Sequence, residues 1–175
     1  MKDTQGRRDT ALTVSRAEEK DIPRLLEIYA SARRFMRENG NPDQWEEGYP
    51  PKELLTEDLR KKRLFVLREG RTIRGVFVFA VEEEATYRVI EDGAWLSNAP
   101  YGVLHRIAGD GEARGIFRAA LGYAEGITGH LRIETHEKNR TMRRLIREAG
   151  FRECGVIRVR NGSNRLAFEK LSGKE

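Results

Sequence analysis

Apolar residues recur along this chain at helical spacing in four segments. From Asp21 to Asn39 every third or fourth position is apolar, so this segment is predicted to be a helix. Pro23 is tolerated in its first turn, and the glycine directly after Asn39 ends the pattern. A short amphipathic helix is predicted over 52–61, and two further helices over 116–127 and 139–150.

Shorter apolar stretches separated by turn residues predict strands. The stretch 73–81 is nearly all apolar, which is typical of a central strand, and it forms a predicted hairpin with 64–67. Asn161-Gly162-Ser163-Asn164 is typical of the turn of a second hairpin. The expected strands are 12–15, 64–67, 73–81, 101–108, 131–135, 155–160 and 165–170.

The order of these elements predicts a single α/β domain of the α+β kind. A strand, helix, strand crossover from Tyr101 to Thr135 places its two strands in parallel, so a mixed sheet with helices on both faces is expected. Residues 1–11 are polar and are predicted to form a flexible tail before a domain over 12–171. The segment 82–95 contains three consecutive Glu residues and is predicted to be an irregular acidic loop.

Charge and hydropathy exclude two classes of partner. Among 175 residues, 33 are Lys or Arg and 28 are Asp or Glu, for a net charge of +5. The basic residues are scattered except for Arg140, Arg143, Arg144 and Arg147 on one helix face, and no aromatic ladder accompanies these, so no nucleic-acid partner is expected. The longest apolar run, 76–81, is far short of the ~20 residues of a membrane span, so no membrane partner is expected.

The cysteine content and the first residues indicate a cytoplasmic, metal-free protein. Cys154 is the single cysteine, so it forms no internal disulfide, and with three scattered histidines it forms no metal-ligand pattern. It is expected to be a small core residue rather than a nucleophile. The first eleven residues lack the apolar core of a signal peptide.

A glycine-rich loop follows the predicted strand 101–108 and opens the next helix. The loop, Gly109-Asp-Gly-Glu-Ala-Arg-Gly115, presents successive backbone N–H groups at the positive end of a helix dipole, which suits a pyrophosphate. An ordinary strand-to-helix turn has the same composition. No Walker lysine and no dinucleotide-type glycine triplet is present, so nucleoside triphosphate and nicotinamide ligands are not expected.

The run from His136 to Phe151 resembles the segment by which Gcn5-related N-acetyltransferases (GNATs) are recognised. That segment has an Asn, a small or apolar residue three positions on, a residue seven on that is often Tyr, and Gly-Phe at eleven and twelve. This chain has Asn139, Met142, Ile146, Gly150 and Phe151 in those places.

The resemblance extends to other parts of the chain. Residues 112–117 resemble the pyrophosphate loop of the superfamily through Arg114, Gly115 and Ile116. The order of elements is similar from about Leu12 to Leu171, which implies a mostly antiparallel sheet of about seven strands. Likeness to a bacterial branch of the superfamily lies in Gln44-Trp45, Thr86-Tyr87, 90–93, Trp95, 105–108 and 162–167.

The resemblance implies an acetyl-CoA-dependent N-acetyltransferase that transfers an acetyl group to a primary amine by direct attack in a ternary complex. The acceptor is expected to be a small-molecule or peptide amine. The oligomeric state stays open, with a homodimer among the alternatives. The implied acetyl-CoA contacts are Ile107, Gly109, Ala113, Arg114, Gly115, Ile116, Phe117 and Asn139. The implied acceptor contacts are Trp45, Glu91, Trp95 and Tyr101.

His105 is the expected general base. It lies on the strand that leads into the loop, where related enzymes often carry a Glu with that role, and an imidazole is a fair base near neutral pH. A histidine that is simply packed in the sheet is the alternative. The acidic residues of 82–92 are typical of a solvated loop, and the alternative is an acidic rim that favours a cationic acceptor.

Three positions depart from the superfamily pattern. Glu112 stands where Gln or Arg is common, and Phe117 stands where a tiny residue usually lets the loop approach phosphate. Ile146 occupies the place of the Tyr that often protonates the leaving thiolate. These departures leave a non-catalytic acyl-CoA-binding or regulatory domain of the same fold as the alternative function.

Overall fold

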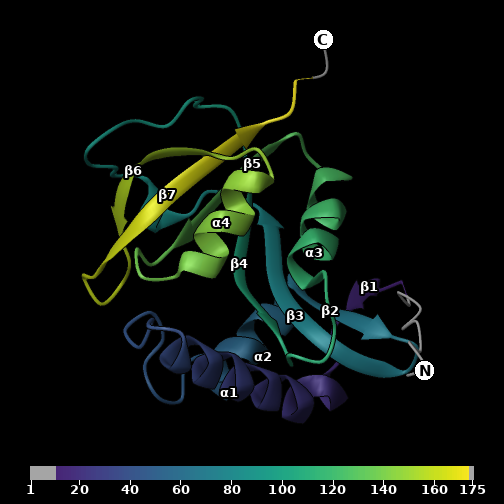
Figure 1. Cartoon of the computed structure of the whole chain (residues 1–175). Helices are drawn as coiled ribbons and strands as arrows, with labels where there is room; N and C mark the ends of the chain where they lie inside the picture. The colour runs from purple at the N-terminus through teal and green to yellow at the C-terminus, as the bar shows by residue number, and fades with distance from the viewer. Residues whose placement is uncertain (1–10, 174–175) are drawn as a thin grey trace, which may run out of the picture.

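The structure is a computed structural model that describes residues 11–173. The predicted tail over 1–11 lies outside the described residues apart from Ala11. Strands, α-helices and two short 3-10 turns alternate along the described part of the chain (Figure 1). They are β1 (Thr13–Arg16), η1 (Glu19–Asp21), α1 (Ile22–Glu38), α2 (Lys52–Arg60), β2 (Leu64–Glu69), β3 (Thr72–Val81), η2 (Ala85–Tyr87), β4 (Gly102–Gly109), α3 (Ile116–Glu125), β5 (His130–Thr135), α4 (Arg140–Glu148), β6 (Arg152–Arg158) and β7 (Asn164–Leu171).

The strands form one seven-stranded sheet in the order β1-β2-β3-β4-β5-β7-β6. β4 and β5 are parallel, and the other neighbouring pairs are antiparallel. α3 connects β4 to β5, so the predicted parallel crossover is confirmed, together with a mixed and mostly antiparallel sheet.

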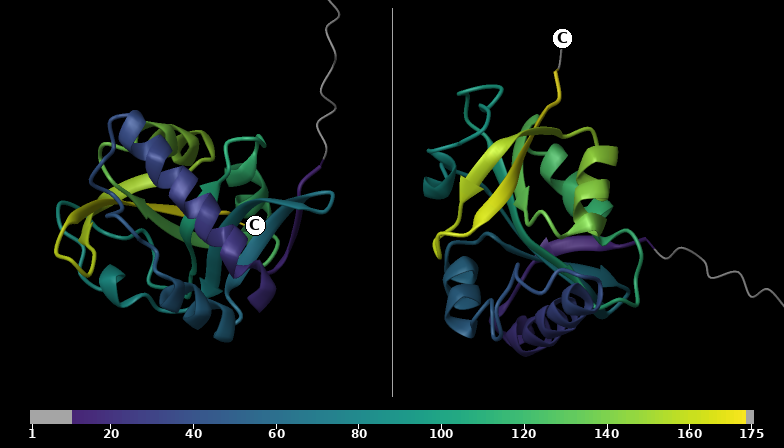
Figure 2. Two further views of the ribbon diagram at one scale, coloured as in Figure 1. Left: turned by 90° about the horizontal axis from the view of Figure 1, so that it is seen from below. Right: turned by 60° about the vertical axis from the view of Figure 1, so that its left-hand side comes forward.

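Successive side chains of the central strands face two different cores, as the period of two in a strand requires. Phe65 and Phe77 pack in the core beneath α3 and α4. Val66 and Val76 pack in the core beneath α1 and α2. α3 and α4 lie side by side on one face of the sheet and α1 lies on the other, which confirms helices on both faces (Figures 1 and 2).

The segment between β3 and β4 covers the rest of the face on which α1 packs. It contains the short turn η2 but no strand within these described residues, so the predicted irregular loop over 82–95 is confirmed. Tyr87 packs here against Val103 of β4 and Ala167 of β7. This loop, residues 82–101, is called the excursion below.

β4 contains a β-bulge near its middle. Val76 of β3 pairs with Ala108, whereas Val78 pairs with His105, so β4 has one more residue than β3 across this interval. Arg106 accordingly has a left-handed backbone with φ +46°. A bulge bends its strand and re-aims the side chains around it, here directly after His105.

β6 begins at Arg152, three residues before the predicted start at Gly155. Gly155 interrupts the alternating apolar pattern of this strand because the strand has a bulge between Glu153 and Gly155. A Cβ atom at Gly155 would be 2.4 Å from the carbonyl oxygen of Glu91, so only glycine lets the excursion approach this strand. Glu91 and Val156 form an isolated antiparallel bridge there.

Candidate active site

β4 and β5 separate from each other partway along their length. Within residues 11–173 they pair at Gly102 with Leu131 and at Val103 with Arg132, whereas β4 runs on to Gly109. The facing edges of the two strands therefore retain free backbone groups. α3 begins after the end of β4 and α4 after the end of β5. Ligands of α/β sheets bind at the carboxyl ends of strands, so this separation is the candidate site.

The loop after β4 is anchored by an inward-facing carboxylate. Asp110 is held by Arg24 at 2.8 Å and by Arg74 at 3.2 Å, and its other oxygen accepts a hydrogen bond from the backbone of Glu112. The two arginines neutralise a negative charge that would otherwise repel an anionic ligand at this loop.

The glycines of this loop leave its outer surface open. Gly111 and Gly115 have left-handed φ angles of +84° and +80°, and a Cβ atom at either position would meet nothing within 4 Å. Gly115 is also the N-cap of α3, whose first N–H groups have no partners within the helix. Open backbone donors at the positive end of a helix fit a diphosphate.

Two predicted contact residues at the start of α3 are turned inward. Ile116 packs over the glycines of two strands: a Cβ atom at Gly75 would be 2.8 Å from its side chain, and one at Gly109 would be 3.0 Å away. Phe117 is 8% exposed and lies in the α3 core. Its ring therefore does not cover the loop, so the expected obstacle to phosphate at this position is absent. Arg114 is exposed on the loop, whereas Ala113 and Ile107 are half-buried.

Asn139 is the N-cap of α4, as its spacing predicts. Its Oδ1 accepts a hydrogen bond from the backbone of Met142 at 3.0 Å, and its Nδ2 donates to Oε1 of Gln44 at 2.9 Å. Gln44 is fixed in turn by Arg165, which donates to its carbonyl oxygen at 2.8 Å. The loop after α1 is therefore fastened to the start of α4.

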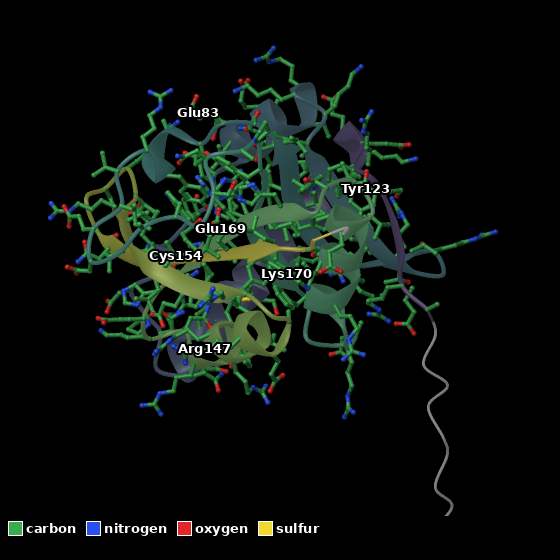
Figure 3. All side chains as sticks on the ribbon, turned by 90° about the horizontal axis from the view of Figure 1, so that it is seen from above. Glu83, Tyr123, Arg147, Cys154, Glu169 and Lys170 are labelled. Atoms are coloured by element: carbon green, nitrogen blue, oxygen red, sulfur yellow. The ribbon has the colours of Figure 1, made fainter. Side chains whose placement is uncertain are left out.

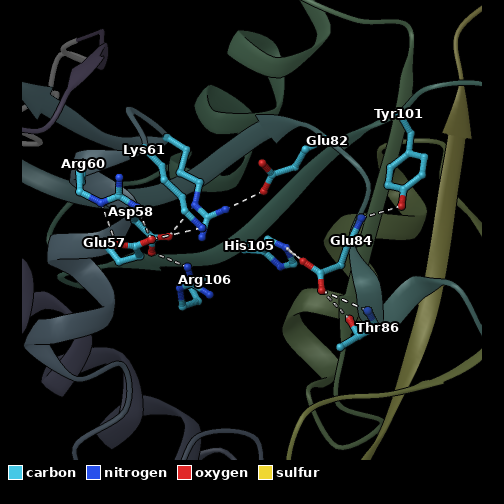
Figure 4. Close-up of polar contacts among 11 residues, drawn as sticks. Glu57, Asp58, Arg60, Lys61, Glu82, Glu84, Thr86, Tyr101, His105 and Arg106 are labelled. Atoms are coloured by element: carbon cyan, nitrogen blue, oxygen red, sulfur yellow. Dashed lines mark hydrogen bonds and ion pairs between the residues drawn. The ribbon is translucent and has the colours of Figure 1, made fainter.

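His105 lies between two carboxylates that come from different segments. Figure 4 shows its contact with the first of them, Glu84. Its Nε2 is 3.4 Å from Oε2 of Glu84 in the excursion, and its Nδ1 is 3.7 Å from Oε2 of Glu134 on β5. The contact with His105 lowers the pKa of Glu84 to about 2.

Glu134 has a further partner in Tyr87. The phenol of Tyr87 donates a hydrogen bond to Oε2 of Glu134. Burial and the negative charge of Glu134 raise the pKa of Tyr87 well above its usual value, so this phenol keeps its proton. The sequence analysis did not place Glu84, Tyr87 or Glu134 beside His105. Tyr87 appeared there only in the likeness to a bacterial branch, and Glu84 only among the acidic residues of 82–92.

Of the four predicted acceptor contacts, two lie in one packed group. The guanidinium of Arg132 lies 4.1 Å from the centre of the Trp95 ring and 3.9 Å from that of Tyr101. Trp95 also donates to the carbonyl oxygen of Tyr87 at 2.8 Å. These two aromatics therefore support the excursion from which Tyr87 reaches Glu134.

The other two predicted acceptor contacts, Trp45 and Glu91, lie apart from the group formed by Trp95, Tyr101 and Arg132. Trp45 packs edge-on against Tyr29 of α1, with ring centres 5.6 Å apart. Glu91 is exposed and pairs with Arg158 of β6 at 3.4 Å. Trp95 and Tyr101 therefore pack around Tyr87, whose ring centre is 6.1 Å from that of His105. Trp45 packs on α1 instead, and Glu91, although it belongs to the excursion, contacts β6.

A buried polar cluster ties the excursion to β5 and β7. Its centre is Glu169 of β7, which Figure 3 shows beside Cys154. Glu169 is fully buried and accepts hydrogen bonds from Arg132 at 3.0 Å, from the backbone of Leu96 and from His130. Cys154 lies beside it, and burial raises the pKa of this thiol to about 11, so it stays protonated. This agrees with the expected role of Cys154 as a small core residue.

The clustered arginines of α4 lie away from His105. They line a shallow hollow of about 420 Å³ on the surface of the helix, formed by Arg140, Arg143, Arg144, Arg147 and Glu148. Across residues 11–173, no group of three or more His, Cys, Asp or Glu side chains is arranged to hold a metal ion. Among the helices of this range, none has the length and apolar character needed to cross a membrane.

Comparisons with known proteins give a consistent result at the level of structure. No protein-family model and no curated protein matches the chain. A GNAT-family acetyltransferase from Streptococcus agalactiae is similar with a TM-score of 0.84 and 28% identity, over 93% of this chain and 96% of that one.

More distant structures share the fold. A GNAT-family acetyltransferase from Listeria monocytogenes has a TM-score of 0.68 at 18% identity, over 92% of this chain and 95% of that one. The ribosomal-protein-S18-alanine N-acetyltransferase from Escherichia coli has a TM-score of 0.58 at 15% identity, over 94% and 98% of the two chains. With its seven-stranded sheet, its separated parallel strands and its likeness to the streptococcal protein, the chain has the fold of the Gcn5-related N-acetyltransferases, a superfamily of acyltransferase enzymes.

Proposed function

We propose that this chain is an acetyl-CoA-dependent N-acetyltransferase that acts on a small-molecule or peptide primary amine by direct attack in a ternary complex. The separation of β4 from β5 beyond Val103 is the observation that most supports the proposal. An extended pantetheine arm can pair its amides with free strand edges, much as an added strand does. His105 lies on the β4 side of this separation.

The diphosphate of acetyl-CoA would bind the loop after β4 and the first turn of α3. Gly111 and Gly115 keep this surface open, and exposed Arg114 adds a positive charge. The carboxylate of Asp110 faces inward, so it does not oppose an anion at the backbone N–H groups, whereas the carboxylate of Glu112 is exposed on the loop. The residues of this loop therefore fit the diphosphate of acetyl-CoA.

The proposed reaction conserves atoms and charge. The lone pair of the acceptor nitrogen attacks the carbonyl carbon of the thioester, and the C–S bond breaks to release coenzyme A as its thiolate. Nε2 of His105 accepts the proton that the nitrogen loses and returns it to solvent or to the thiolate. Glu84, 3.4 Å from this nitrogen, stabilises the imidazolium while it exists.

The leaving thiolate departs without a general acid in this proposal. Ile146, in the place where the superfamily often has Tyr, is fully buried in the core and has no proton to give. A thiol with an ordinary pKa of ~8.5 leaves as the thiolate at little cost near neutral pH.

Thiol release from acetyl-CoA in the presence of a panel of primary amines tests the proposal, with acetyl-CoA binding measured in parallel by calorimetry. Amine-dependent release is expected to exceed the rate without amine for at least one class of acceptor. Acetyl-CoA binding without any amine-dependent release would favour the alternative, a non-catalytic acyl-CoA-binding domain. A protein that neither binds acetyl-CoA nor releases thiol with any amine would overturn both the transferase and the acyl-CoA-binding function.

A further inference from the structure

His105 and Glu134 occupy the same row of the sheet, beyond the last pair of β4 and β5. In the two existing pairs the partner on β5 is 29 residues later, since 131 − 102 = 29 and 132 − 103 = 29. The same offset matches His105 with Glu134. Side chains alternate along strands, so both face the side on which Tyr87 and Val103 pack.

Glu134 is held in place from the buried side. Tyr87, 1% exposed, donates its phenol hydrogen to Glu134, and its carbonyl oxygen accepts from Trp95 at 2.8 Å. The rings of Tyr87 and Trp95 are 5.3 Å apart at their centres. Tyr87 is therefore a fixed donor that orients the carboxylate of Glu134 toward β4.

The two ring nitrogens of His105 have different surroundings. Nδ1 faces Glu134, which the buried Tyr87 anchors. Nε2 faces Glu84, which accepts from the backbone and hydroxyl of Thr86 in the excursion. An imidazole that directs an Nδ1–H at Glu134 leaves the lone pair of Nε2 for a proton from another group.

We propose that Tyr87 and Glu134 are positioning residues that hold His105 by its Nδ1 edge and present Nε2 to the acceptor amine. This inference rests on the proposed function of His105 as the general base. Glu134 accepts no proton in the reaction; it orients the ring and selects the tautomer that can act as a base.

Kinetics of Glu134→Ala and Tyr87→Phe, each made in the wild-type and the His105→Ala backgrounds, test the proposal. Misplacing a catalytic group by about 1 Å costs on the order of 10²-fold, so Glu134→Ala should lower kcat by up to that factor and leave the KM for acetyl-CoA unchanged. Tyr87→Phe should cause a smaller loss, because Glu134 remains. In the His105→Ala background, neither change should lower kcat further, since residues that act through one another are not additive.

Two matched variants serve as controls. Glu125→Ala removes a carboxylate that pairs with Lys170 on the other face, and Tyr123→Phe removes the hydroxyl of an aromatic that packs against Phe65. Both should keep wild-type kcat. Melting temperatures of all variants identify any that fail to fold, and Glu134→Gln, which keeps an acceptor oxygen, should recover part of the kcat lost in Glu134→Ala.

The tautomer of His105, read by ¹⁵N NMR, gives a measurement that does not depend on turnover. The Nδ1–H tautomer is expected to dominate in the wild type and to lose population in Glu134→Ala. An unchanged tautomer, or equal losses of kcat with and without His105, would overturn the positioning role. If His105→Ala keeps wild-type turnover while the tautomer still responds to Glu134→Ala, the positioning role stands and the general-base assignment is wrong.

Discussion

The phenol of Tyr29 donates a hydrogen bond of 2.8 Å to the carbonyl oxygen of Arg106. Arg106 has the left-handed backbone of the bulge in β4, and its guanidinium pairs with the fully buried carboxylate of Asp58 on α2. α1 and α2 therefore hold the bulge from the face opposite α3. The backbone of β4 next to His105 is therefore fixed by residues that come from two other elements.

Tyr29→Phe should destabilise the protein and weaken acetyl-CoA binding. The substitution keeps the buried ring but leaves the carbonyl of Arg106 without its donor, which costs about 1–3 kcal/mol of unfolding free energy. Urea denaturation measures the first effect and calorimetry the second. Tyr123→Phe, a change of the same size in the other core, should leave acetyl-CoA affinity unchanged; equal affinities in all three proteins would contradict this role of the bulge.

Gly115→Asp should abolish the stabilisation that acetyl-CoA provides. A ligand that binds only the folded state adds ~2.7 kcal/mol at about 100 times its Kd, or roughly 5–10 °C of Tm in a domain of this size. The new carboxylate would lie where the diphosphate is proposed to bind. Gly162→Asp is the matched control, because Gly162 has a similar φ of +82° and open surroundings in the β6–β7 turn.

The same Tm measurements also test whether the protein uses acetyl-CoA as its acyl donor. Both glycine variants should lose similar intrinsic stability, because each places a side chain in a left-handed backbone. Gly162→Asp should nevertheless keep the full acetyl-CoA shift. A wild-type protein with no shift at millimolar acetyl-CoA would end the proposal that it uses this donor.

His105→Ala should lower kcat by 10²–10⁴-fold, the usual cost of losing a positioned base, and leave acetyl-CoA affinity nearly intact. The acidic limb of the rate profile should be lost or moved. The acceptor in this experiment needs a known pKa of its own, because it also titrates. If the variant keeps more than about a third of wild-type turnover, proton removal belongs to bulk water or to another group such as Glu134 or His136.

Glu84→Gln should change how stability depends on pH in the acid range. The contact with His105 lowers the pKa of Glu84 from 4.5 to about 2 in the folded protein. A carboxyl with a depressed folded-state pKa contributes stability that is fully present above pH 4.5 and is lost as the pH falls toward 2. Allowing for partial exposure, the wild type should lose about 2 kcal/mol more than the variant across this window.

Urea denaturation at several pH values measures this difference. Glu57→Gln is the control, because Arg60 lowers the pKa of Glu57 to about 2 as well, but the Glu57 side chain is 40% exposed and solvent screens the pair. Parallel pH dependence in wild type and Glu84→Gln would show that the contact with His105 does not persist in solution.

Most elements of the fold could be predicted because their signals are local. The apolar stretch 73–81 became the central strand β3, and Asn161-Gly162-Ser163-Asn164 became the turn between β6 and β7. Asn139 caps α4, and Gly150 after this helix has a left-handed φ of +90°. Each of these outcomes depends on side-chain periodicity or on backbone preferences of neighbouring residues, which a sequence displays directly.

The superfamily motifs and the general position of His105 on the strand before the glycine-rich loop could likewise be read from the sequence alone. The partners of His105 could not, because Glu84, Tyr87 and Glu134 come from the excursion and from β5. The inward turn of Phe117 and the bulge at Arg106 also depend on packing against other elements. The register between β4 and β5 is a contact between strands far apart in the sequence and joined through α3, so only the tertiary structure brought a carboxylate of one strand to the imidazole of the other.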